Sequence, residues 1–341
     1  MIKKIFNWRN IVILLLAFIL FIPSVQAESR VITDMSGRKV ELPVQINRIV
    51  TTYVPATQFV FALGAEDKLV GIDVGSPRMQ MELLSTLKPD FKGLPAVGGL
   101  KSGINLEEII ALNPDLVVLF PYREAPVIAD KLQQQGISSL IIKPESFKLI
   151  RETNLLLGKT LNLEKEAAII DKQFAKILTL INRSGNIPQT EKRKVYFANS
   201  TLFNTVGEGM LQTDMIQLAG GFNPARDVKS GFIESSPEQL IIWNPDIIIT
   251  SHFFSGNDEQ LLIEPRYQSV KAFVSDSIYR FPSNLEPWDF PSPACYPGVL
   301  WLSEKIYPER YEDVSIKEII NNFYESIYGK SYEELGGEFP L

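Results

Sequence analysis

The chain has 341 residues, a formal net charge of −6 and 45% hydrophobic residues. This length is ample for more than one hydrophobic core, and an acidic chain without a basic run argues against nucleic acid or anionic lipid as a partner. The sequence holds a single cysteine and a single histidine, which excludes an intrachain disulfide and a thiolate metal cluster.

The first 27 residues have the pattern of a secretory signal peptide. Basic residues open the chain, 11–22 is apolar, and 25–27 resembles a small-residue cleavage site. The apolar stretch is short for a membrane-spanning helix. We therefore expect an exported, periplasmic protein that is cleaved near Ala27 and carries no lipid-modified cysteine.

The elements up to residue 160 predict one α/β lobe. A small hairpin is expected at 31–42. A helix beginning near Pro55 and closed by Gly64 follows the first core strand. The expected core strands are 48–53, 69–72, 116–119 and 139–142.

A long amphipathic helix is expected to connect this lobe to a second one. From Leu163 onward, apolar residues recur at helical spacing. They are Ala167, Ile170, Phe174, Ile177, Leu178 and Ile181.

The second lobe repeats the plan of the first. A strand at 194–199 leads to a helix at 213–219, and another strand is expected at 278–281. The stretch 281–297 is rich in proline and reads as a stiff loop before helices at 298–306 and 316–328. The predicted organisation is a signal peptide at 1–27, an N-terminal lobe at 28–160, a connecting helix at 161–186 and a C-terminal lobe at 187–341.

One segment occurs twice, at 106–119 and at 237–250. Each copy predicts a helix, an Asn-Pro-Asp turn and a strand buried on both faces. Asn105 and Ser236 precede the two helices as expected N-caps, and each is followed three residues later by Glu or Gln. A repeat this long indicates two similar doubly wound α/β lobes, with a ligand cleft between them.

These segments resemble those of class III periplasmic solute-binding proteins, which serve ABC importers for ferric siderophores, haem and cobalamin. The match includes "Leu-Glu-Glu-Ile…Asn-Pro-Asp-Leu-Val", "Pro-Glu-Gln-Leu…Asn-Pro-Asp-Ile-Ile", the opening hairpin at 32–43 and the strand start at 47–50. It covers essentially all of the chain beyond the signal peptide. The resemblance implies that Glu107 and Glu238 meet arginines of an inner-membrane permease dimer. A helix dipole alone also favours an acid at the second helical position.

Ligands of open α/β sheets bind beyond the carboxyl ends of the strands, and this rule selects loops in both lobes. Aromatic, cationic and hydroxyl-bearing residues converge there. The predicted ligand-contact residues are Tyr53, Lys101, Tyr122, Arg123, Phe203, Phe232, His252, Phe253 and Trp288.

Several of these residues also have a purely structural interpretation. Arg123 can make a bidentate contact with a carboxylate, phosphate or catecholate oxygen, or it can be a solvated surface arginine. His252 can ligate a haem or corrinoid metal, or it can only donate a hydrogen bond. Trp288 can contact a ligand or only pin its loop. Of the adjacent Phe253 and Phe254, at least one is expected to pack inward.

The resemblance and the aromatic and cationic residues favour a carrier of a metal chelate, foremost an iron complex such as a ferric siderophore. Cobalamin or another corrinoid, haem, and an oxyanion such as molybdate are alternatives within the same fold. A bare zinc or manganese site would need several histidines. A secreted α/β hydrolase would need a G-x-S-x-G elbow, which the sequence lacks. We therefore expect a monomeric binding protein without enzyme activity, cofactor or metal of its own.

Overall fold

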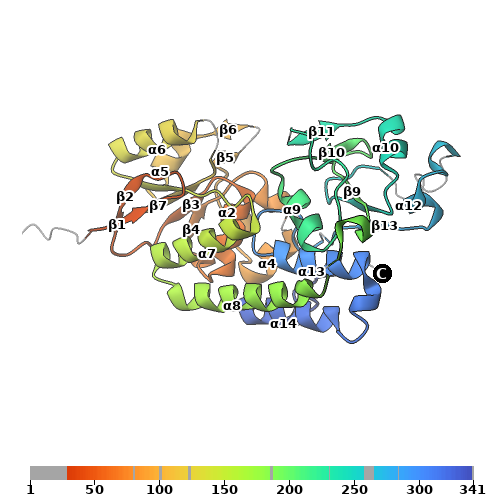
Figure 1. Ribbon diagram of the computed structural model, residues 1–341. Helices are drawn as coiled ribbons and strands as arrows, with labels where there is room; N and C mark the ends of the chain where they lie inside the picture. Colours follow the sequence, from red (N-terminus) through yellow and green to blue (C-terminus); the bar gives the residue numbers. More distant parts are fainter. Residues whose placement is uncertain are drawn as a thin grey trace, which may run out of the picture.

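The computed structural model describes residues 29–79, 81–99, 102–121, 124–184, 187–229, 231–256, 265–282 and 284–339. Two α/β lobes lie side by side, with long helices beneath them (Figure 1). The predicted signal peptide lies outside the described residues. Among the residues that are described, no helix is long and apolar enough to cross a membrane.

The N-terminal lobe is built on a parallel sheet with the strand order β4-β3-β7-β8. These strands are buried because their residues are apolar on both faces. An antiparallel hairpin precedes the sheet. The strands are β1 (Ser29–Thr33), β2 (Lys39–Pro43), β3 (Ile49–Thr51), β4 (Leu69–Gly71), β5 (Gly98–Gly99), β6 (Gly103–Ile104), β7 (Leu116–Leu119) and β8 (Ser138–Ile141). The helices are α2 (Val54–Ala62), α3 (Ser76–Met79), α4 (Met81–Leu87), α5 (Leu106–Ala111), α6 (Ala125–Gln134) and α7 (Phe147–Leu161).

The C-terminal lobe holds a smaller parallel sheet with the order β13-β12-β9, and a separate antiparallel hairpin, β10 with β11. The strands are β9 (Val195–Ala198), β10 (Asn204–Val206), β11 (Phe232–Glu234), β12 (Ile247–Thr250) and β13 (Ile278–Arg280). The helices are α9 (Leu211–Leu218), α10 (Pro237–Trp243), α12 (Lys271–Val274), α13 (Cys295–Ile306) and α14 (Ile316–Tyr328).

The repeated segment has the same turn in both lobes. Asn113 and Asn244 adopt left-handed backbone conformations, with φ of 45° and 44°. Asparagine tolerates this region better than most residues, and the following Pro114 and Pro245 disfavour the α conformation for it. The turn therefore ends each helix and sends the chain directly into its buried strand.

A basic and an acidic residue hold each copy to the neighbouring strand. Arg48, just before β3, donates to the last carbonyls of α5, and its backbone N–H donates to Asp115 at 2.9 Å. Lys194, just before β9, donates in the same way to the end of α10, and its backbone N–H lies 2.8 Å from Asp246. The same stabilising contact therefore occurs in both lobes. In each lobe it joins the repeated segment to a basic residue that lies outside the repeat.

The helices α5 and α10 run antiparallel to the strands that follow them. They end at the amino edge of each sheet, where Arg48 and Lys194 hold them, and they begin directly after the hairpins β5–β6 and β10–β11. If these helices ran parallel to the strands that follow them, their first turns would lie at the amino edge instead. The first turns, with Glu107 and Glu238, therefore lie at the carboxyl edge of each lobe.

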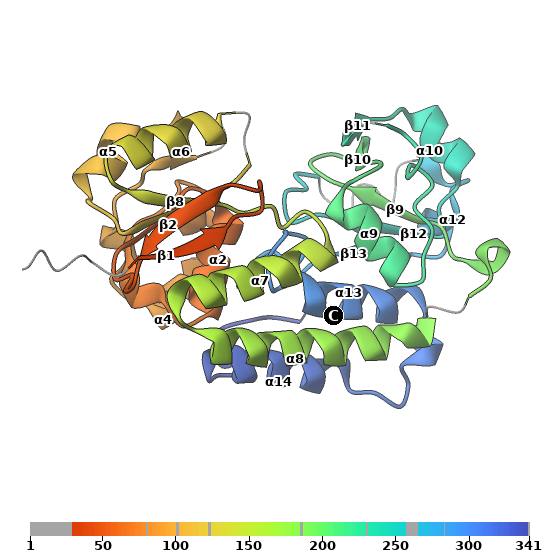
Figure 2. The ribbon, with the colours of Figure 1, turned by 60° about the vertical axis from the view of Figure 1, so that its left-hand side comes forward.

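The lobes share a base of helices. Helix α8 (Glu164–Ile181) buries Ala167, Ile170, Phe174, Ile177 and Ile181, as its spacing predicts. It runs beneath both lobes with α14 alongside it (Figures 1 and 2).

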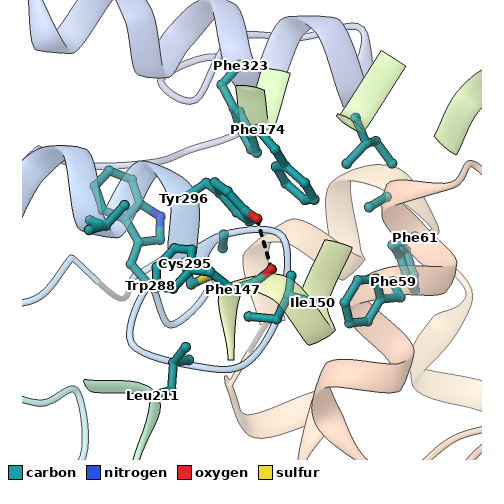
Figure 3. Close-up of a cluster of buried hydrophobic side chains, with 14 of the residues drawn as sticks. Phe59, Phe61, Phe147, Ile150, Phe174, Leu211, Trp288, Cys295, Tyr296 and Phe323 are labelled. Carbon is teal, nitrogen blue, oxygen red and sulfur yellow. Dashed lines mark hydrogen bonds between the residues drawn. The ribbon is translucent and has the colours of Figure 1, made fainter. Parts of the chain in front are cut away.

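Aromatic side chains close the junction above this base (Figure 3). Phe174 stacks on Tyr296 of α13, with ring centroids 3.7 Å apart. The hydroxyl of Tyr296 donates to the carbonyl of Phe147, the first residue of α7, at 3.1 Å. The first lobe's last helix, the connecting helix and the second lobe therefore meet in one continuous core.

Most of the predicted elements are present with bounds within a few residues. The proline-rich loop is shorter than expected, because α13 begins at Cys295 and takes in Pro297. Proline fits there because the first turn of a helix needs no intrahelical N–H bond. Helix α6 was not expected, although Ala125, Ala129 and Leu132 give it a buried face at helical spacing.

Candidate functional site

A small hairpin extends the carboxyl edge of each sheet. The backbone N–H of Val74, after β4, donates to Gly98 of β5 at 3.0 Å. The N–H of Asn199, after β9, donates to Asn204 of β10 at 2.7 Å. The two hairpins stand on the sides of the lobes that face each other (Figure 1). The carboxyl edges of both sheets therefore face one another across the lobes.

On the N-terminal side, two aromatic rings meet at neighbouring strand ends. Tyr53 follows β3, Phe120 follows β7, and their ring centroids are 4.0 Å apart. Both side chains are partly buried. We call this pair the N-lobe cluster.

Close to it lies a buried carboxylate. Asp73, after β4, accepts hydrogen bonds from the backbone N–H groups of Gly75 and Ser76 and from the hydroxyls of Thr57 and Ser76. Burial raises its pKa, and these hydrogen bonds offset part of that effect. With four donors on one carboxylate, Asp73 fixes the turn between β4 and α3 and has no evident capacity left for a ligand.

On the C-terminal side, a carboxylate joins the end of β12 to the loop after β13. Asp289 Oδ2 accepts from the hydroxyl of Ser251 at 2.5 Å, and Oδ1 lies 3.0 Å from His252 Nδ1. The rings of Phe253 and Phe290 lie against His252, with centroids 3.8 and 4.9 Å away. We call these five residues the C-lobe cluster.

The imidazole of His252 is the most unusual group in this cluster. Its side chain is only 10% exposed, and the carboxylate beside it is 1% exposed. Among the described residues, Nε2 is buried and has no hydrogen-bond partner. An ionised Asp289 can only accept, so it favours the tautomer with a proton on Nδ1, which leaves Nε2 as the unprotonated nitrogen of a neutral ring.

The predicted ligand residues do not all join these clusters. Tyr53, His252 and Phe253 do. Phe203 is partly buried and packs against Tyr267, with centroids 6.0 Å apart. Phe232 is 55% exposed on the hairpin strand β11. Lys101, Tyr122 and Arg123 lie outside the described residues.

Trp288 is placed differently from its prediction. Its side chain is fully buried, and its indole N–H donates to the hydroxyl of Tyr324 at 2.8 Å. Such a ring pins its loop in the core and offers no surface to a solute. In the same loop, Asp289 and Phe290 reach the C-lobe cluster instead. The sequence also offers Asp289 as a candidate in this proline-rich loop, next to Trp288, and neighbouring residues of an irregular loop can point to opposite sides.

The aromatic pair after β12 divides as expected. Phe254 is 4% exposed and belongs to the lobe core, while Phe253 is 43% exposed. The exposed ring of Phe253 lies next to the buried histidine and gives the C-lobe cluster an apolar surface that a solute can contact.

Glu107 and Glu238 occupy the second position of α5 and α10, and both side chains are exposed. The preceding Asn105 and Ser236 accept the N–H three residues later at 3.1 and 3.2 Å, as in an N-cap. Hydrogen bonds from its own backbone N–H and from Ser236 hold the pKa of Glu238 below its usual value. Each lobe therefore presents one carboxylate on an ordered helix start.

Two surface hollows lie elsewhere. One of about 550 Å³ is lined by residues such as Arg38, Asn113 and Ser138, and one of about 490 Å³ by residues such as Asp246, Lys271 and Ser277. Both lie at the amino edges of the sheets. Ligands of open α/β sheets bind at the opposite edge, so we place the candidate site at the two clusters. Within the described ranges, no three His, Cys, Asp or Glu side chains are grouped to hold a metal ion.

Comparisons with known proteins agree with this architecture. A family model described as a periplasmic binding protein matches residues 49–285. The molybdate-binding protein MolA of Haemophilus influenzae is 26% identical over 325 residues, which cover 89% of this chain and 92% of that protein.

Two crystal structures share the fold. A periplasmic solute binding protein from Veillonella parvula is 27% identical with a TM-score of 0.78, covering 89% of this chain and 94% of that one. The molybdate-bound form of Haemophilus influenzae MolA superimposes with a TM-score of 0.79 at 24% identity, covering 89% and 99%.

Proposed function

We propose, from the premise that this chain belongs to the periplasmic binding protein family, that it captures one small solute between its lobes and delivers it to an ABC importer. Membership of this family confirms the resemblance to class III periplasmic solute-binding proteins that the repeated segments indicate. The proposal rests chiefly on the C-lobe cluster, where Nε2 of His252, just after β12, is buried and lacks a hydrogen-bond partner in the described part of the chain.

An oxyanion of the molybdate class is the solute that we favour. A relative of similar length carries that specificity in its name. The chemistry of the C-lobe cluster is compatible with it: when the ring of His252 carries both protons, Nδ1–H donates to Asp289 and Nε2–H can donate to an anion oxygen.

A metal chelate, such as a ferric siderophore, is the second candidate. It is favoured by the same histidine in its neutral form. Asp289 then holds the proton on Nδ1, and the lone pair on Nε2 can approach a metal, an arrangement typical of histidine ligands that a carboxylate orients. The aromatic rings of Tyr53, Phe120 and Phe253 would contact the organic part of such a chelate. Haem and cobalamin fall in the same chemical class.

Lys101, Tyr122 and Arg123 remain proposed ligand contacts on the N-terminal side. If the solute is anionic, Arg123→Ala should weaken binding at least about tenfold, because a charged contact in a partly desolvated site typically contributes ~2 kcal/mol. Isothermal calorimetry of the two proteins measures this. An unchanged dissociation constant would place Arg123 on the outer surface.

We further propose that Glu107 and Glu238 contact the permease. Both carboxylates are exposed at the carboxyl edge of their lobes, one on each lobe. A permease dimer seated over this edge would meet both acids and would receive the solute directly from between the lobes.

The test is a binding survey with the mature protein. Native mass spectrometry and calorimetry are run with molybdate, tungstate, sulfate, a ferric catecholate siderophore, haem and cobalamin. One saturable partner per chain is expected, with molybdate bound better than sulfate. Binding of a chelate but of no oxyanion would select the second candidate. Failure of every class would refute the solute-carrier proposal for these ligands.

A further inference from the structure

The loop at 281–294 connects the two lobes as well as carrying part of the candidate site. Glu286 and Asp289 are both 1% exposed. Three residues span at most about 10 Å of chain, so the two carboxylates are close neighbours along it. Glu286 faces the N-terminal lobe and the last helix, whereas Asp289 faces Ser251 and His252.

The loop is held tightly. Gln212 of α9 donates to the carbonyl of Asp289 at 2.9 Å. On the α13 side, a Cβ added to Gly298 would lie 2.6 Å from the carbonyl oxygen of Trp288, so helix and loop are in close contact. The loop between Glu286 and Asp289 is therefore packed against both α9 and α13.

Glu286 receives two hydrogen bonds from two different parts of the chain. Gln58 Nε2, on helix α2 of the N-terminal lobe, donates to one carboxylate oxygen at 2.8 Å. The hydroxyl of Tyr324, on α14, donates to the other at 2.9 Å, and itself accepts from the indole of Trp288. The carboxylate thus joins the first lobe, the last helix and the site loop.

The surroundings of Glu286 are aromatic. The rings of Tyr328 and Tyr332 pack against Tyr324, with centroids 5.7 and 4.9 Å from its ring. Among the described residues, the charged groups acting on these tyrosines are the acidic Glu66, Glu82 and Glu338, besides Glu286 itself. No basic side chain is an ion-pair partner of Glu286 in the described part of the chain.

Gln58 can serve both protonation states of this carboxyl group. Its Nε2 donates to the ionised form, while Oε1 is buried and has no partner among the described residues. If the carboxyl gains a proton, a turn of the amide by 180° lets Oε1 accept a hydrogen bond from the new O–H group. The bond between the lobes then persists but loses its charge, and hydrogen bonds to charged groups are roughly twice as strong as neutral ones.

We propose that Glu286 is a proton-responsive positioning residue: its charge state sets how firmly helix α2 holds the 281–294 loop, and through Asp289 and His252 it sets the affinity for the solute. Burial raises the pKa of Glu286 to about 7, against hydrogen bonds from Tyr324 and Gln58 that lower it, so the carboxyl changes its charge close to neutral pH. For an anionic solute, the ionised form opposes binding, because it brings a second negative charge near the site.

The test uses two reporters that need no ligand. The indole N–H of Trp288 reports on Glu286 through Tyr324, and the ring protons of His252 are unique because the chain has one histidine. Both NMR signals are followed from pH 5 to 9 in wild type, Glu286→Gln and the control Glu41→Gln, whose side chain is exposed on strand β2. A step near pH 7 in the Trp288 signal is expected in wild type and in Glu41→Gln, and is expected to vanish in Glu286→Gln. Because an imidazole can titrate in this range by itself, the His252 signal is read as the difference between the wild-type and Glu286→Gln curves.

A further variant separates titration from coupling. Gln58→Met removes the N-lobe donor and keeps the carboxyl group, so the Trp288 step should persist at higher pH, while the His252 curve should match that of Glu286→Gln. This variant also covers the case in which Glu286→Gln fails to fold. A Trp288 signal without a step in wild type, or superimposable His252 curves in wild type and Glu286→Gln, would overturn the proposal.

The affinity measurement rests on the proposed function and is therefore kept separate. With molybdate as the probe, the ratio of wild-type affinity to Glu286→Gln affinity should fall at least about fivefold between pH 6 and pH 8.5. A factor of about five is the lower end of the usual coupling between two sites in a protein. A constant ratio would refute the link to affinity. If molybdate binds neither protein at any pH, the oxyanion assignment fails, and the two NMR curves still decide whether Glu286 controls the site loop.

Discussion

At the scale of single residues, the C-lobe cluster depends on one carboxylate with two tasks. Asp289 accepts from Ser251 and holds His252 through Nδ1, and it is buried where neither bond can be replaced by water. Removing its charge should therefore affect the orientation and protonation of the histidine more than the shape of the loop.

We expect Asp289→Asn to reverse the tautomer of His252. An asparagine NH₂ can donate to Nδ1, which moves the ring proton to Nε2. The ¹⁵N shifts of the single histidine should show this exchange, and solute affinity should drop about tenfold. Stability should fall by about 1–3 kcal/mol, the usual penalty when a buried polar partner is lost. Asp227→Asn, on the exposed surface, is the matched control. Unaltered ¹⁵N shifts in Asp289→Asn would mean that Asp289 does not set the tautomer.

A second residue-scale prediction concerns the junction between the lobes. Tyr296→Phe keeps the ring that stacks on Phe174 but removes the hydroxyl that donates to the carbonyl of Phe147. The free energy of unfolding should decrease by about 1–2 kcal/mol, because that carbonyl is buried. Urea denaturation measures the difference, with the less buried Tyr279→Phe as control. Equal midpoints for Tyr296→Phe and wild type would show that this bond makes no net contribution.

At the scale of elements, the two copies of the repeat act as equivalent units. Each begins after a hairpin at the carboxyl edge, carries an exposed acid at its second helical position, and ends in an Asn turn at the amino edge. This equivalence places Glu107 and Glu238 on the same edge as the candidate site. It accounts for how a partner that spans both lobes could meet both.

Charge reversal of both acids should separate transport from binding. We expect Glu107→Lys with Glu238→Lys to abolish uptake in cells, since it sets like charges against the permease, and to leave solute affinity unchanged in calorimetry. The helices themselves should persist, because their N-caps Asn105 and Ser236 remain in place. Glu304→Lys, far from these helix starts in the sequence, is the control. Normal uptake by the double variant would contradict the docking role, and a loss of affinity would place these acids in the solute site.

At the scale of the whole molecule, the lobes are joined by a core that contains an ionisable group. The pKa of Glu286 is about 7 in the folded protein against an ordinary value of 4.5. Between these two pH values the folded state retains a proton that the unfolded state has released. The contribution of Glu286 to stability is thus complete below pH 4.5 and declines as the pH rises to about 7.

Glu286→Gln should remove this decline. The difference of pKa corresponds to about 3 kcal/mol, so the variant should be more stable than wild type at pH 8 by up to that amount and similar to it at pH 5. Urea denaturation at pH 5, 6, 7 and 8 gives the two curves. Glu41→Gln, at an exposed position of β2, should run parallel to wild type. Parallel curves for Glu286→Gln and wild type would mean that the buried carboxyl does not titrate in this range.

The sequence by itself determined the features that arise from local patterns. Unbroken apolar runs specify buried strands, spacing specifies the face of α8, and the duplicated helix–turn–strand segment implies two lobes, because these signals lie within a few neighbouring residues. The caps Asn105 and Ser236 were predictable for the same reason.

Only the tertiary structure decided which distant groups meet. Asp289 and not Trp288 contacts His252, because the indole of Trp288 is bonded to Tyr324 of α14. Gln58 contacts Glu286 because of how the lobes pack. The contact between His252 and Asp289 likewise joins two separate loops. Such contacts depend on long-range packing, which leaves no periodic pattern in the chain.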